Sequence, residues 1–383
     1  MTTEIIDLTR VEDSRDVVHR IVEKLSAGKL VALPTETVYG IAASALQPAA
    51  VSRLRELKAR DGDKPFALAI RNADECKDYV PDMSPLALRL SRRVWPGPVT
   101  LVLPNENRDS AVFQLDPEVQ KAVTTGSTIG IRVSPNELLE QVLSLTAGPL
   151  ALTSANFNAE EPATDDTELE KLDGHVDLIV KTGKTHFGAP STVVEVNGQA
   201  IRILREGVVD KPAIDQLSGF IGVIVCTGNT CRSPMGEGIF KKLIAESLGC
   251  KMDELEAHGV TILSAGIAAG PGAPAAMQSM TVMQDYGIDI SDHQSRPVTP
   301  RLADYADLML TMTNGHRNAI LNEWPTLESR VRTIRTDGGD ISDPIGSPIP
   351  VYQGCAEQIE SCLREWMSKI DFHQFQTESW PTT

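Results

Sequence analysis

The sequence predicts an α/β protein with two domains. Its 383 residues exceed the length of one typical domain and are enough to bury two hydrophobic cores. Apolar, β-branched runs alternate with helical patterns, which is the order of elements in α/β sheets. The alternation loosens around residues 208–220, before a new apolar run. We therefore expect a first domain over 1–208, a linker over 209–219, a second domain over 220–372 and a loosely held tail over 373–383.

The first domain begins with an amphipathic helix and continues as a series of strands. In residues 14–26, Val17, Ile21 and Leu25 recur four apart, and Gly28 closes the pattern, as in a helix with one apolar face. Helical patterns separate several of the later apolar runs, so we expect helices to cover the sheet. The runs predict strands at 30–34, 66–70, 100–104, 129–133, 150–155, 191–196 and 201–204.

The second domain alternates strand and helix more regularly. This alternation implies right-handed crossovers and therefore a doubly wound parallel sheet of four strands. Ligands of such sheets bind at the carboxyl ends of the strands, and Cys226 follows the first strand directly. We expect strands at 221–225, 260–266, 306–312 and 331–334, and helices near 235–249, 273–287 and 350–369, with a short helix after the third strand.

Composition narrows the classes of protein. Hydrophobic residues make up 41% and charged residues 23%, and no window approaches the roughly 18 consecutive apolar residues of a membrane helix. The N-terminus lacks the basic and apolar segments of a secretory signal, so we expect a soluble, cytoplasmic protein with no membrane partner. The net charge of −16 argues against broad, non-specific binding of nucleic acid, although a local basic cleft could hold phosphates.

The cysteines are scattered along the chain, and their spacing favours reactive roles over structural ones. They follow neither a disulfide framework nor the CxxC spacing of metal sites, which suits a reducing compartment. A cysteine with a functional role in this chain is therefore expected to be a reactive thiol. The six positions are Cys76, Cys226, Cys231, Cys250, Cys355 and Cys362.

The stretch "CTGNTCRSPM" (226–235) has the spacing of a loop that wraps a tetrahedral anion. Backbone N–H groups of 227–232 can point inward, Gly228 relieves steric limits, and Ser233 followed by proline suits the start of a helix. The helix N-terminus would aim partial positive charge at a phosphate and favour a thiolate at Cys226. Arg232 adds planar, bidentate recognition of phosphoryl oxygens.

A lone buried cysteine is more often a small hydrophobic residue, but the joint pattern favours a site. Strand, Cys-x5-Arg-Ser-Pro, helix and a later Asp-Pro occur in order, from Cys226 to Asp343. Cys231 has two interpretations. It either packs in the core or forms a reversible disulfide with Cys226 under oxidation.

Residues from about 221 to 370 resemble the low-molecular-weight protein phosphatases. The resemblance implies that Cys226 attacks phosphorus, that Arg232 binds the phosphoryl oxygens, and that no cofactor is required. It implies that Ser233 stabilises the thiolate, and that Asn229 braces a phosphate loop that also contains Thr227, Gly228, Thr230 and Cys231. Asp343 would protonate the leaving group and then deprotonate the attacking water.

The phosphatase substrate depends on residues around the loop. Tyrosine-directed members commonly carry a branched apolar residue at the position of Thr230 and aromatic residues after Asp-Pro, where this chain has Ile345 and Gly346. The loop is similar to that of the arginine phosphatases of the family. We therefore expect a protein substrate that carries phosphoarginine or phosphotyrosine. Arsenate reductase is the alternative, although no cysteine lies between Cys250 and Cys355 to take up the oxidation.

Short polar motifs follow several predicted strands of the first domain. They are "LPTETVYG" (33–40), "LKARDGDKPF" (57–66), "TSAN" (153–156), "PSTVV" (190–194) and "LREG" (204–207). In an extended chain Lys58 and Arg60 would share a face and converge on one polyphosphate, whereas on a helix they would diverge. The candidate contacts in these motifs are Thr35, Lys58, Arg60, Lys64, Ser154, Asn156, Ser191 and Arg205.

Over residues 10 to 208 these motifs resemble the YrdC-like threonylcarbamoyl-AMP synthases, which have a twisted α/β sheet. The family joins L-threonine, bicarbonate and ATP, and a separate complex transfers the product to tRNA. The resemblance implies that Thr35 and Arg60 hold threonine, with Lys64 at the same cleft. Lys58, Ser154, Asn156 and Arg205 would contact the nucleotide phosphates, with Ser191 nearby. Mg²⁺ would enter mainly on ATP itself.

Two features leave a second interpretation open for the first domain. Asp61 stands where the family usually has proline, which bears on the rigidity of the basic loop. Each basic residue taken singly is more often solvated surface. The alternative to a synthase is a non-catalytic RNA-binding module with a basic cleft.

Overall fold

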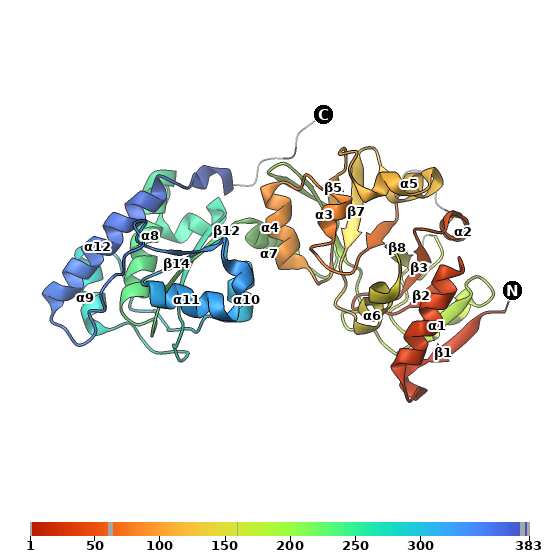
Figure 1. Cartoon of the computed structure of the whole chain (residues 1–383), viewed down its shortest axis with the longest axis horizontal. Coiled ribbons are helices and arrows are strands. Elements are labelled where there is room, and N and C mark those ends of the chain that lie inside the picture. Colours follow the sequence, from red (N-terminus) through yellow and green to blue (C-terminus); the bar gives the residue numbers. More distant parts are fainter. Residues whose placement is uncertain (1, 60–63, 159, 376–379, 381–383) are drawn as a thin grey trace. The chain divides into compact units, whose positions relative to one another are not determined.

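The structure is a computed structural model that describes residues 2–59, 64–158, 160–375 and 380. The chain divides into two compact units between Leu217 and Ser218. Figure 1 shows that each unit is a sheet with helices packed against it. No helix in these described ranges is long and apolar enough to cross a membrane.

The first unit is built on one mixed sheet. Within the described residues this sheet has eleven strands in the order β1-β9-β2-β3-β8-β4-β7-β5-β10-β11, with β6 paired to β7. The strands are β1 (Glu4–Asp7), β2 (Val31–Leu33), β3 (Gly40–Ser44), β4 (Ala67–Ala69), β5 (Val99–Pro104), β6 (Thr124–Thr125), β7 (Thr128–Arg132), β8 (Leu150–Ser154), β9 (Leu178–Lys181), β10 (Thr192–Asn197) and β11 (Ala200–Arg205). The helices are α1 (Ser14–Ser26), α2 (Pro48–Leu57), α3 (Cys76–Tyr79), α4 (Pro85–Val94), α5 (Pro117–Val123), α6 (Glu137–Leu145) and α7 (Lys211–Ser218).

Helices cover both faces of this sheet because apolar side chains alternate along its strands. In β2, Val31 and Leu33 belong to a core shared with α1 and α6, whereas Ala32 belongs to a core shared with α2, α4 and α5. Helix α1 begins after Asp13, whose carboxylate accepts a hydrogen bond from the backbone N–H of Arg15. The three apolar residues predicted for its inner face are buried, and each contributes about 2 kcal/mol.

β3 is a strand that the pattern of apolar runs did not predict. Its sequence, Gly-Ile-Ala-Ala-Ser, has little intrinsic preference for a strand, yet all five residues are buried between β2 and β8. A Cβ at Gly40 would lie 2.8 Å from a methyl carbon of Leu152, so close packing requires the small residue. The strands β1 and β9, which pair in parallel, were also not expected.

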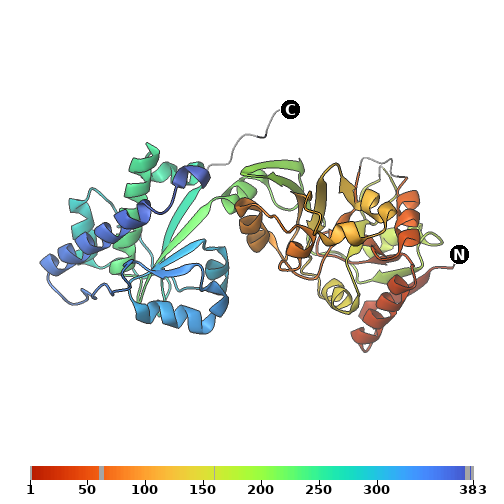
Figure 2. The same cartoon turned by 45° about the horizontal axis from the view of Figure 1, so that its top comes forward.

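The second unit is a doubly wound parallel sheet, as predicted. Its four strands among the described residues pair in parallel in the order β13-β12-β14-β15. They are β12 (Phe220–Cys226), β13 (Val260–Gly266), β14 (Leu308–Thr311) and β15 (Val331–Thr333). Figure 2 shows this sheet between two helix layers. One core contains α8 (Arg232–Leu248), α9 (Met277–Asp285) and α12 (Ile349–Met367), and the other contains α10 (Pro300–Tyr305) and α11 (Asn314–Glu323).

Parts of the segments expected as linker and tail form helices in the structure. Helix α7 occupies much of the segment 209–219, and its Ile214 is fully buried in the core of the first unit. The short helix η6 (Phe372–Phe375) extends into the expected tail. Its two phenylalanine rings lie 5.4 and 4.7 Å, between centroids, from the ring of Phe220 in β12. Burial of these apolar side chains is the reason that both segments join a core.

Candidate active sites

The loop after β12 forms the candidate site of the second unit. β12 ends at Cys226 and α8 begins at Arg232, and these two residues are 3% and 4% exposed. The backbone N–H of Asn229 donates to the sulfur of Cys226 at 3.3 Å. The loop therefore directs a backbone donor at the thiol, in front of a helix N-terminus, which is an arrangement that attracts anions.

Ser233 contacts the thiol instead of starting the helix. We expected Ser233 to cap α8, but Cys231 is the N-cap residue and makes no capping bond with its side chain. The hydroxyl oxygen of Ser233 lies 3.0 Å from the sulfur of Cys226 and accepts a hydrogen bond from the side-chain amide of Asn229 at 2.9 Å. The buried polar cluster around the thiol holds this hydroxyl, so it is not available to the helix terminus. A hydroxyl so placed can stabilise a thiolate.

Asn229 carries the unusual backbone conformation of the loop. We expected Gly228 to relieve the steric limits, but the left-handed residue is Asn229, with φ of 55°. Its side chain is fully buried, donates to the hydroxyls of Ser233 and Ser264, and accepts from the backbone N–H of Arg296 at 2.8 Å. Because every polar atom of the amide is engaged, Asn229 can hold the loop in this shape.

Gly266, in the motif "SAG", lies against the back of this loop. A Cβ at this position would lie 2.4 Å from the carbonyl oxygen of Thr227 and 2.9 Å from the backbone nitrogen of Asn229. No other residue type fits without displacing the loop. A close approach between segments this far apart in the chain leaves no local signal in the sequence.

Arg232 and Asp343 contact each other in the second unit. One terminal nitrogen of Arg232 donates to the carbonyl oxygen of Ile341 at 3.0 Å, and the other donates to the carboxylate of Asp343. The Nε atom of Arg232 is buried and has no hydrogen-bond partner among the described residues. Asp343 is more accessible, with 39% of its side chain exposed. A buried guanidinium donor without a partner is suited to an anionic ligand.

Thr230 and Cys231 complete the loop. The carbonyl oxygen of Thr230 accepts from the backbone N–H of Ala276 at 2.8 Å, and its hydroxyl lies 3.7 Å from the sulfur of Cys231. That sulfur lies 3.5 Å from the hydroxyl of Tyr352, and burial together with this contact raises the pKa of Tyr352. All six cysteines are free thiols. Cys231 is thus a buried free thiol packed against Tyr352.

The first unit contains a cavity of about 630 Å³ that brings several predicted contacts together. Strands from different parts of the chain supply its walls. Among the residues that line it are Thr35, Lys64, Ser154, Ser191 and Arg205, each of which we predicted as a ligand contact. Arg60 and Asp61 lie outside the described residues.

Lys58 supports the loop that contains Ser154 and Asn156. Its side chain is buried, and Nζ donates to the carbonyl oxygens of Ser154 at 3.1 Å and Asn156 at 2.6 Å and to the side-chain oxygen of Asn156 at 2.7 Å. The hydroxyl of Ser154 donates to the same side-chain oxygen at 2.6 Å. The shape of this loop at the end of β8 therefore depends on one ammonium group.

Ser191 and Arg205 form a second cluster in the cavity. The guanidinium of Arg205 donates to the carbonyl oxygen of Ser191 at 2.6 Å and to its hydroxyl at 3.0 Å. Burial and the positive charge of Arg132 lower the pKa of Arg205. An arginine remains charged at neutral pH even so. The two arginines therefore make this cavity attractive to anions.

Arg132 is a cavity residue that the sequence did not single out, and it pairs with Glu36 of the polar motif after β2. Arg132 ends β7 and lines the cavity, and one of its terminal nitrogens donates to Glu36 at 2.7 Å and to the hydroxyl of Thr37 at 2.5 Å. Its Nε atom is buried with no partner among the described residues. The signal was present as a single charged residue at the carboxyl end of the apolar run "IGIRV".

Thr35 contributes to the same turn with its hydroxyl. The Thr35 hydroxyl donates to the carbonyl oxygen of Val38 at 2.6 Å and lies 2.9 Å from the hydroxyl of Thr37. Because Thr37 also accepts from Arg132, the turn after β2 and the end of β7 are joined by one polar network. Tertiary pairing of distant segments brings this network together, and the spacing of the motifs did not indicate it.

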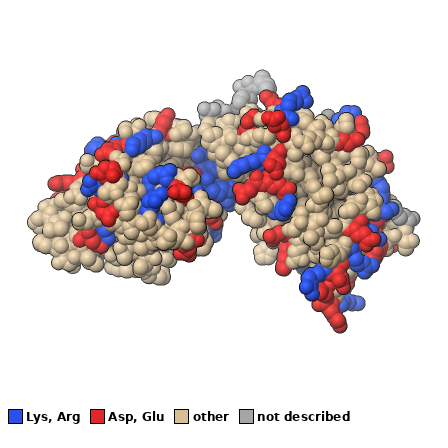
Figure 3. All heavy atoms as spheres, viewed as in Figure 1, with Lys and Arg blue, Asp and Glu red and all other residues tan. Residues whose placement is uncertain are grey.

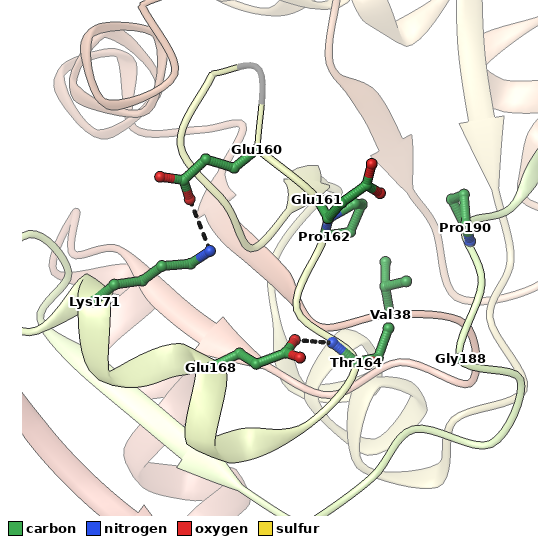
Figure 4. Close-up of a pocket in the computed structure, with 9 residues that line it drawn as sticks. All are labelled: Val38, Glu160, Glu161, Pro162, Thr164, Glu168, Lys171, Gly188 and Pro190. Atoms are coloured by element: carbon green, nitrogen blue, oxygen red, sulfur yellow. Dashed lines mark hydrogen bonds and ion pairs between the residues drawn. The ribbon is translucent and has the colours of Figure 1, made fainter.

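A second hollow of about 600 Å³ adjoins the cavity, with Val38 and Pro190 lining both. Figure 4 shows Lys171 directed at Glu160 and Glu168 directed at the backbone of Thr164. These contacts measure 2.7 and 2.8 Å. Glu160 and Glu168 thus bond to partners within the wall of this hollow.

Two family models match the chain, one in each unit. Residues 23–207 match the Sua5/YciO/YrdC model, described as telomere recombination, and residues 222–376 match low molecular weight phosphotyrosine protein phosphatase. A relative from Methanocaldococcus jannaschii, with the name "Putative threonylcarbamoyl-AMP synthase", is 31% identical over 52% of this chain and 89% of its own length. The protein-arginine-phosphatase of Bacillus subtilis is 33% identical over 39% of this chain and 95% of its own length. The chain belongs to both families.

The first unit is accordingly a Sua5/YrdC domain, and the second is a low-molecular-weight phosphatase domain. Both are families of enzymes. The threonylcarbamoyl-AMP synthase of Pyrococcus abyssi is 33% identical over 51% of this chain, but the chain spans only 55% of that relative's length. A solved structure of P. abyssi Sua5 with L-threonine matches with 24% identity and a TM-score of 0.50, covering 69% of this chain and 92% of that chain. This likeness supports the fold of the Sua5/YrdC domain.

Proposed function

We propose that the Sua5/YrdC domain forms L-threonylcarbamoyladenylate and pyrophosphate from L-threonine, bicarbonate and ATP, for later transfer to adenosine in tRNA. The observation that carries this proposal is the cavity in which Arg132 and Arg205 face a common space beside the hydroxyls of Thr35, Ser154 and Ser191. The names of the synthase relatives support it. In this proposal the nucleotide phosphates lie near Arg205 and Ser154, and threonine lies near Thr35.

The lining of the cavity suits this chemistry. The amine of threonine first combines with bicarbonate to give a carbamate and water, and a carbamate oxygen then attacks the α-phosphorus of ATP while the bond to pyrophosphate breaks. Negative charge builds on the phosphoryl group and on the leaving pyrophosphate, and fixed guanidinium groups stabilise both without a covalent intermediate. We propose that Mg²⁺ enters on the phosphates of ATP.

The alternative for this domain is an RNA-binding module without catalysis. On the face seen in Figure 3, basic and acidic side chains of the first unit are intermixed, and this favours a local anion site over an extended surface for a nucleic-acid backbone. Release of pyrophosphate that requires both threonine and bicarbonate supports the synthase. RNA binding without any release of pyrophosphate supports the module.

For the phosphatase domain, we propose removal of phosphate from phosphoarginine or phosphotyrosine in proteins. The sulfur of Cys226 attacks phosphorus and the bond to the leaving group breaks, while Asp343 gives its proton to that group. Asp343 then takes a proton from a water molecule, whose oxygen displaces the sulfur and releases phosphate. The observation that carries the proposal is the unpartnered Nε of Arg232, buried beside the loop that surrounds the thiol. A phosphoryl oxygen would satisfy that donor.

Phosphoarginine is the substrate that this loop favours, in our proposal. Thr230 offers a hydroxyl where an apolar branch would pack against a phenol ring, and Ile345 follows the Asp-Pro motif in place of an aromatic ring. The relatives named protein-arginine-phosphatase, 31 and 33% identical, support the same choice. Arginine carries a polar guanidinium next to the phosphorus, and a hydroxyl can hydrogen-bond it, whereas tyrosine presents an apolar ring.

Replacing Thr230 by isoleucine is expected to shift preference toward phosphotyrosine. The substitution removes the hydroxyl and adds an apolar surface, so the ratio of kcat/KM for phosphotyrosine to that for phosphoarginine should rise about tenfold or more. Thr230→Ser retains the hydroxyl and is the matched control, for which the ratio should change little. Steady-state kinetics on both substrates measure the ratio. A ratio equal to that of the wild type would refute this role for Thr230.

Replacing Asp343 by asparagine is expected to lower kcat about 10²- to 10⁴-fold, because the leaving group then receives no proton. The same change frees Arg232 from its ion pair, so inorganic phosphate should bind about twofold to fivefold more tightly. Inhibition by phosphate and a pH-rate profile test both effects. Asp337→Asn changes an exposed carboxylate in the preceding loop and should alter neither. Unchanged kcat would contradict the acid role, and weaker binding of phosphate would contradict the competition for Arg232.

Arsenate reductase is the alternative for this domain. Its chemistry requires a further thiolate to resolve an oxidised Cys226. Cys355 is a buried candidate, but burial raises the pKa of its thiol to about 12, which leaves little thiolate at neutral pH. A panel of phosphotyrosine, phosphoarginine and arsenate with a thiol reductant separates the two activities. Turnover of arsenate alone would select the reductase.

A further inference from the structure

His316 is a buried ionisable residue beside the phosphatase loop, and no step of the proposed reaction uses it. It is 5% exposed and lies in the first turn of α11, which follows β14. Its Nε2 atom lies 2.9 Å from the hydroxyl oxygen of Thr227, the loop residue after the nucleophile. The same oxygen lies 3.5 Å from a terminal nitrogen of Arg232. Thr227 thus stands between the imidazole and the guanidinium.

The surroundings of His316 favour its neutral form. Burial and the positive charge of Arg232 lower the pKa of His316, and the carboxylates of Asp343 and Asp340 oppose this shift. The N-terminus of α11 adds partial positive charge next to the ring. Nδ1 is buried and has no hydrogen-bond partner within the described ranges. A protonated ring would therefore carry a buried N–H donor without an acceptor.

The neutral ring can hold Thr227 in one orientation. In either neutral tautomer, Nε2 and the hydroxyl share one hydrogen bond. Arg232 has only donors, so the oxygen of Thr227 accepts from it. The carbonyl oxygen of Thr227 also accepts from the backbone N–H of Ala268 at 3.0 Å. The backbone of Thr227 is therefore anchored by Ala268, and its side chain is anchored by Arg232 and the neutral imidazole.

We propose that His316 is a positioning residue of the phosphatase site, whose neutral imidazole orients Thr227 and through it Arg232, and whose protonation disturbs both. This inference rests on the phosphatase reaction proposed above. Protonation makes Nε2 a donor only and places a second positive charge near Arg232. Because the pKa of His316 is lowered in the folded chain, the loss of its support belongs below the ordinary value of 6.5, and that support is complete above it.

The test compares the dependence of kcat and KM on pH, from about 5 to 9, for the full chain and its variants. The substrate is p-nitrophenyl phosphate, because phosphoarginine is unstable in acid. His316→Gln places an uncharged amide nitrogen near the position of Nε2. We expect this variant to keep kcat at pH 7.5 within about threefold of the wild type. Its pH-rate profile should lack one ionisation that the wild type shows on the acid side. His316→Phe and Thr227→Val should each lower kcat/KM about tenfold, and the double variant no further.

The matched control is His373→Gln, which replaces an exposed histidine of the same domain and should keep the wild-type profile. A glutamine variant that retains every acid-side ionisation overturns the inference, as does a phenylalanine variant with wild-type kcat/KM. Additive losses in the double variant do so as well. Thermal unfolding shows whether the phenylalanine variant is folded. If it is not, the glutamine and valine variants decide whether the inference holds. A wild-type chain that hydrolyses neither p-nitrophenyl phosphate nor phosphoarginine in protein overturns the phosphatase proposal itself.

Discussion

Replacing Cys226 by serine is expected to abolish phosphatase turnover while the release of pyrophosphate continues at the wild-type rate. The thiol accepts from the backbone N–H of Asn229 and contacts the hydroxyl of Ser233, and both contacts stabilise a thiolate. A serine hydroxyl has a similar shape but does not ionise near neutral pH, so it cannot attack phosphorus at a comparable rate. We expect kcat to fall at least about 10³-fold.

Hydrolysis of phosphoarginine in protein and of p-nitrophenyl phosphate measures the first activity, and pyrophosphate release in the same preparation measures the second. Cys250→Ser is the matched control, because Cys250 follows the end of α8 at a distance from the loop in sequence and is only partly buried. A serine variant at position 226 with full phosphatase rate contradicts the assignment of the nucleophile. Equal loss of both activities would indicate misfolding of the variant, which thermal unfolding of the chain checks.

Replacing Lys58 by methionine is expected to lower threonine-dependent release of pyrophosphate at least about 100-fold. Methionine retains most of the length of the side chain but removes the ammonium group that holds Ser154 and Asn156. Three oxygen atoms of the loop then lose a charged donor, at a cost on the order of 3 kcal/mol in the free energy of unfolding of this unit. The loop at the end of β8 should lose its shape, and with it the predicted contacts to phosphate.

The phosphatase activity of the same chain serves as an internal control, since it depends on a different unit. Lys121→Met removes an exposed lysine from the first unit and should leave pyrophosphate release unchanged. If Lys58→Met releases pyrophosphate at the wild-type rate, the loop does not need this ammonium group. Binding of ATP, measured by calorimetry, distinguishes a lost nucleotide site from a slow chemical step.

Much of the second unit was predictable because its signals are local. The apolar run before Cys226, the Cys-x5-Arg spacing and the row of apolar residues after it all lie within about thirty residues. In the structure these three features are a strand, a loop and a helix in direct succession. In the first unit, helix α1 was predicted for the same reason. β3 was not, because its small residues form a strand only when β2 and β8 enclose it.

The roles of individual side chains required the folded arrangement. The sequence alone indicated Ser233 as a helix cap and Gly228 as the flexible residue, since both are common uses of those residue types. In the structure the thiol engages Ser233, and Asn229 takes the left-handed conformation. Contacts with Ser264 and Arg296, more than thirty residues away, hold Asn229 in place.

The order of residues was sufficient to predict two α/β domains, a loop between a strand and a helix at Cys226, and five of the residues that line the cavity of the first unit. These conclusions rest on residue types at short spacings, which local geometry converts into a strand end, a loop or a helix terminus. The pairing of Arg132 with Glu36, the approach of Gly266 to the loop and the contact of His316 with Thr227 came only from the tertiary structure. Each joins segments that are far apart along the chain, and neither periodicity nor spacing records which distant side chains meet.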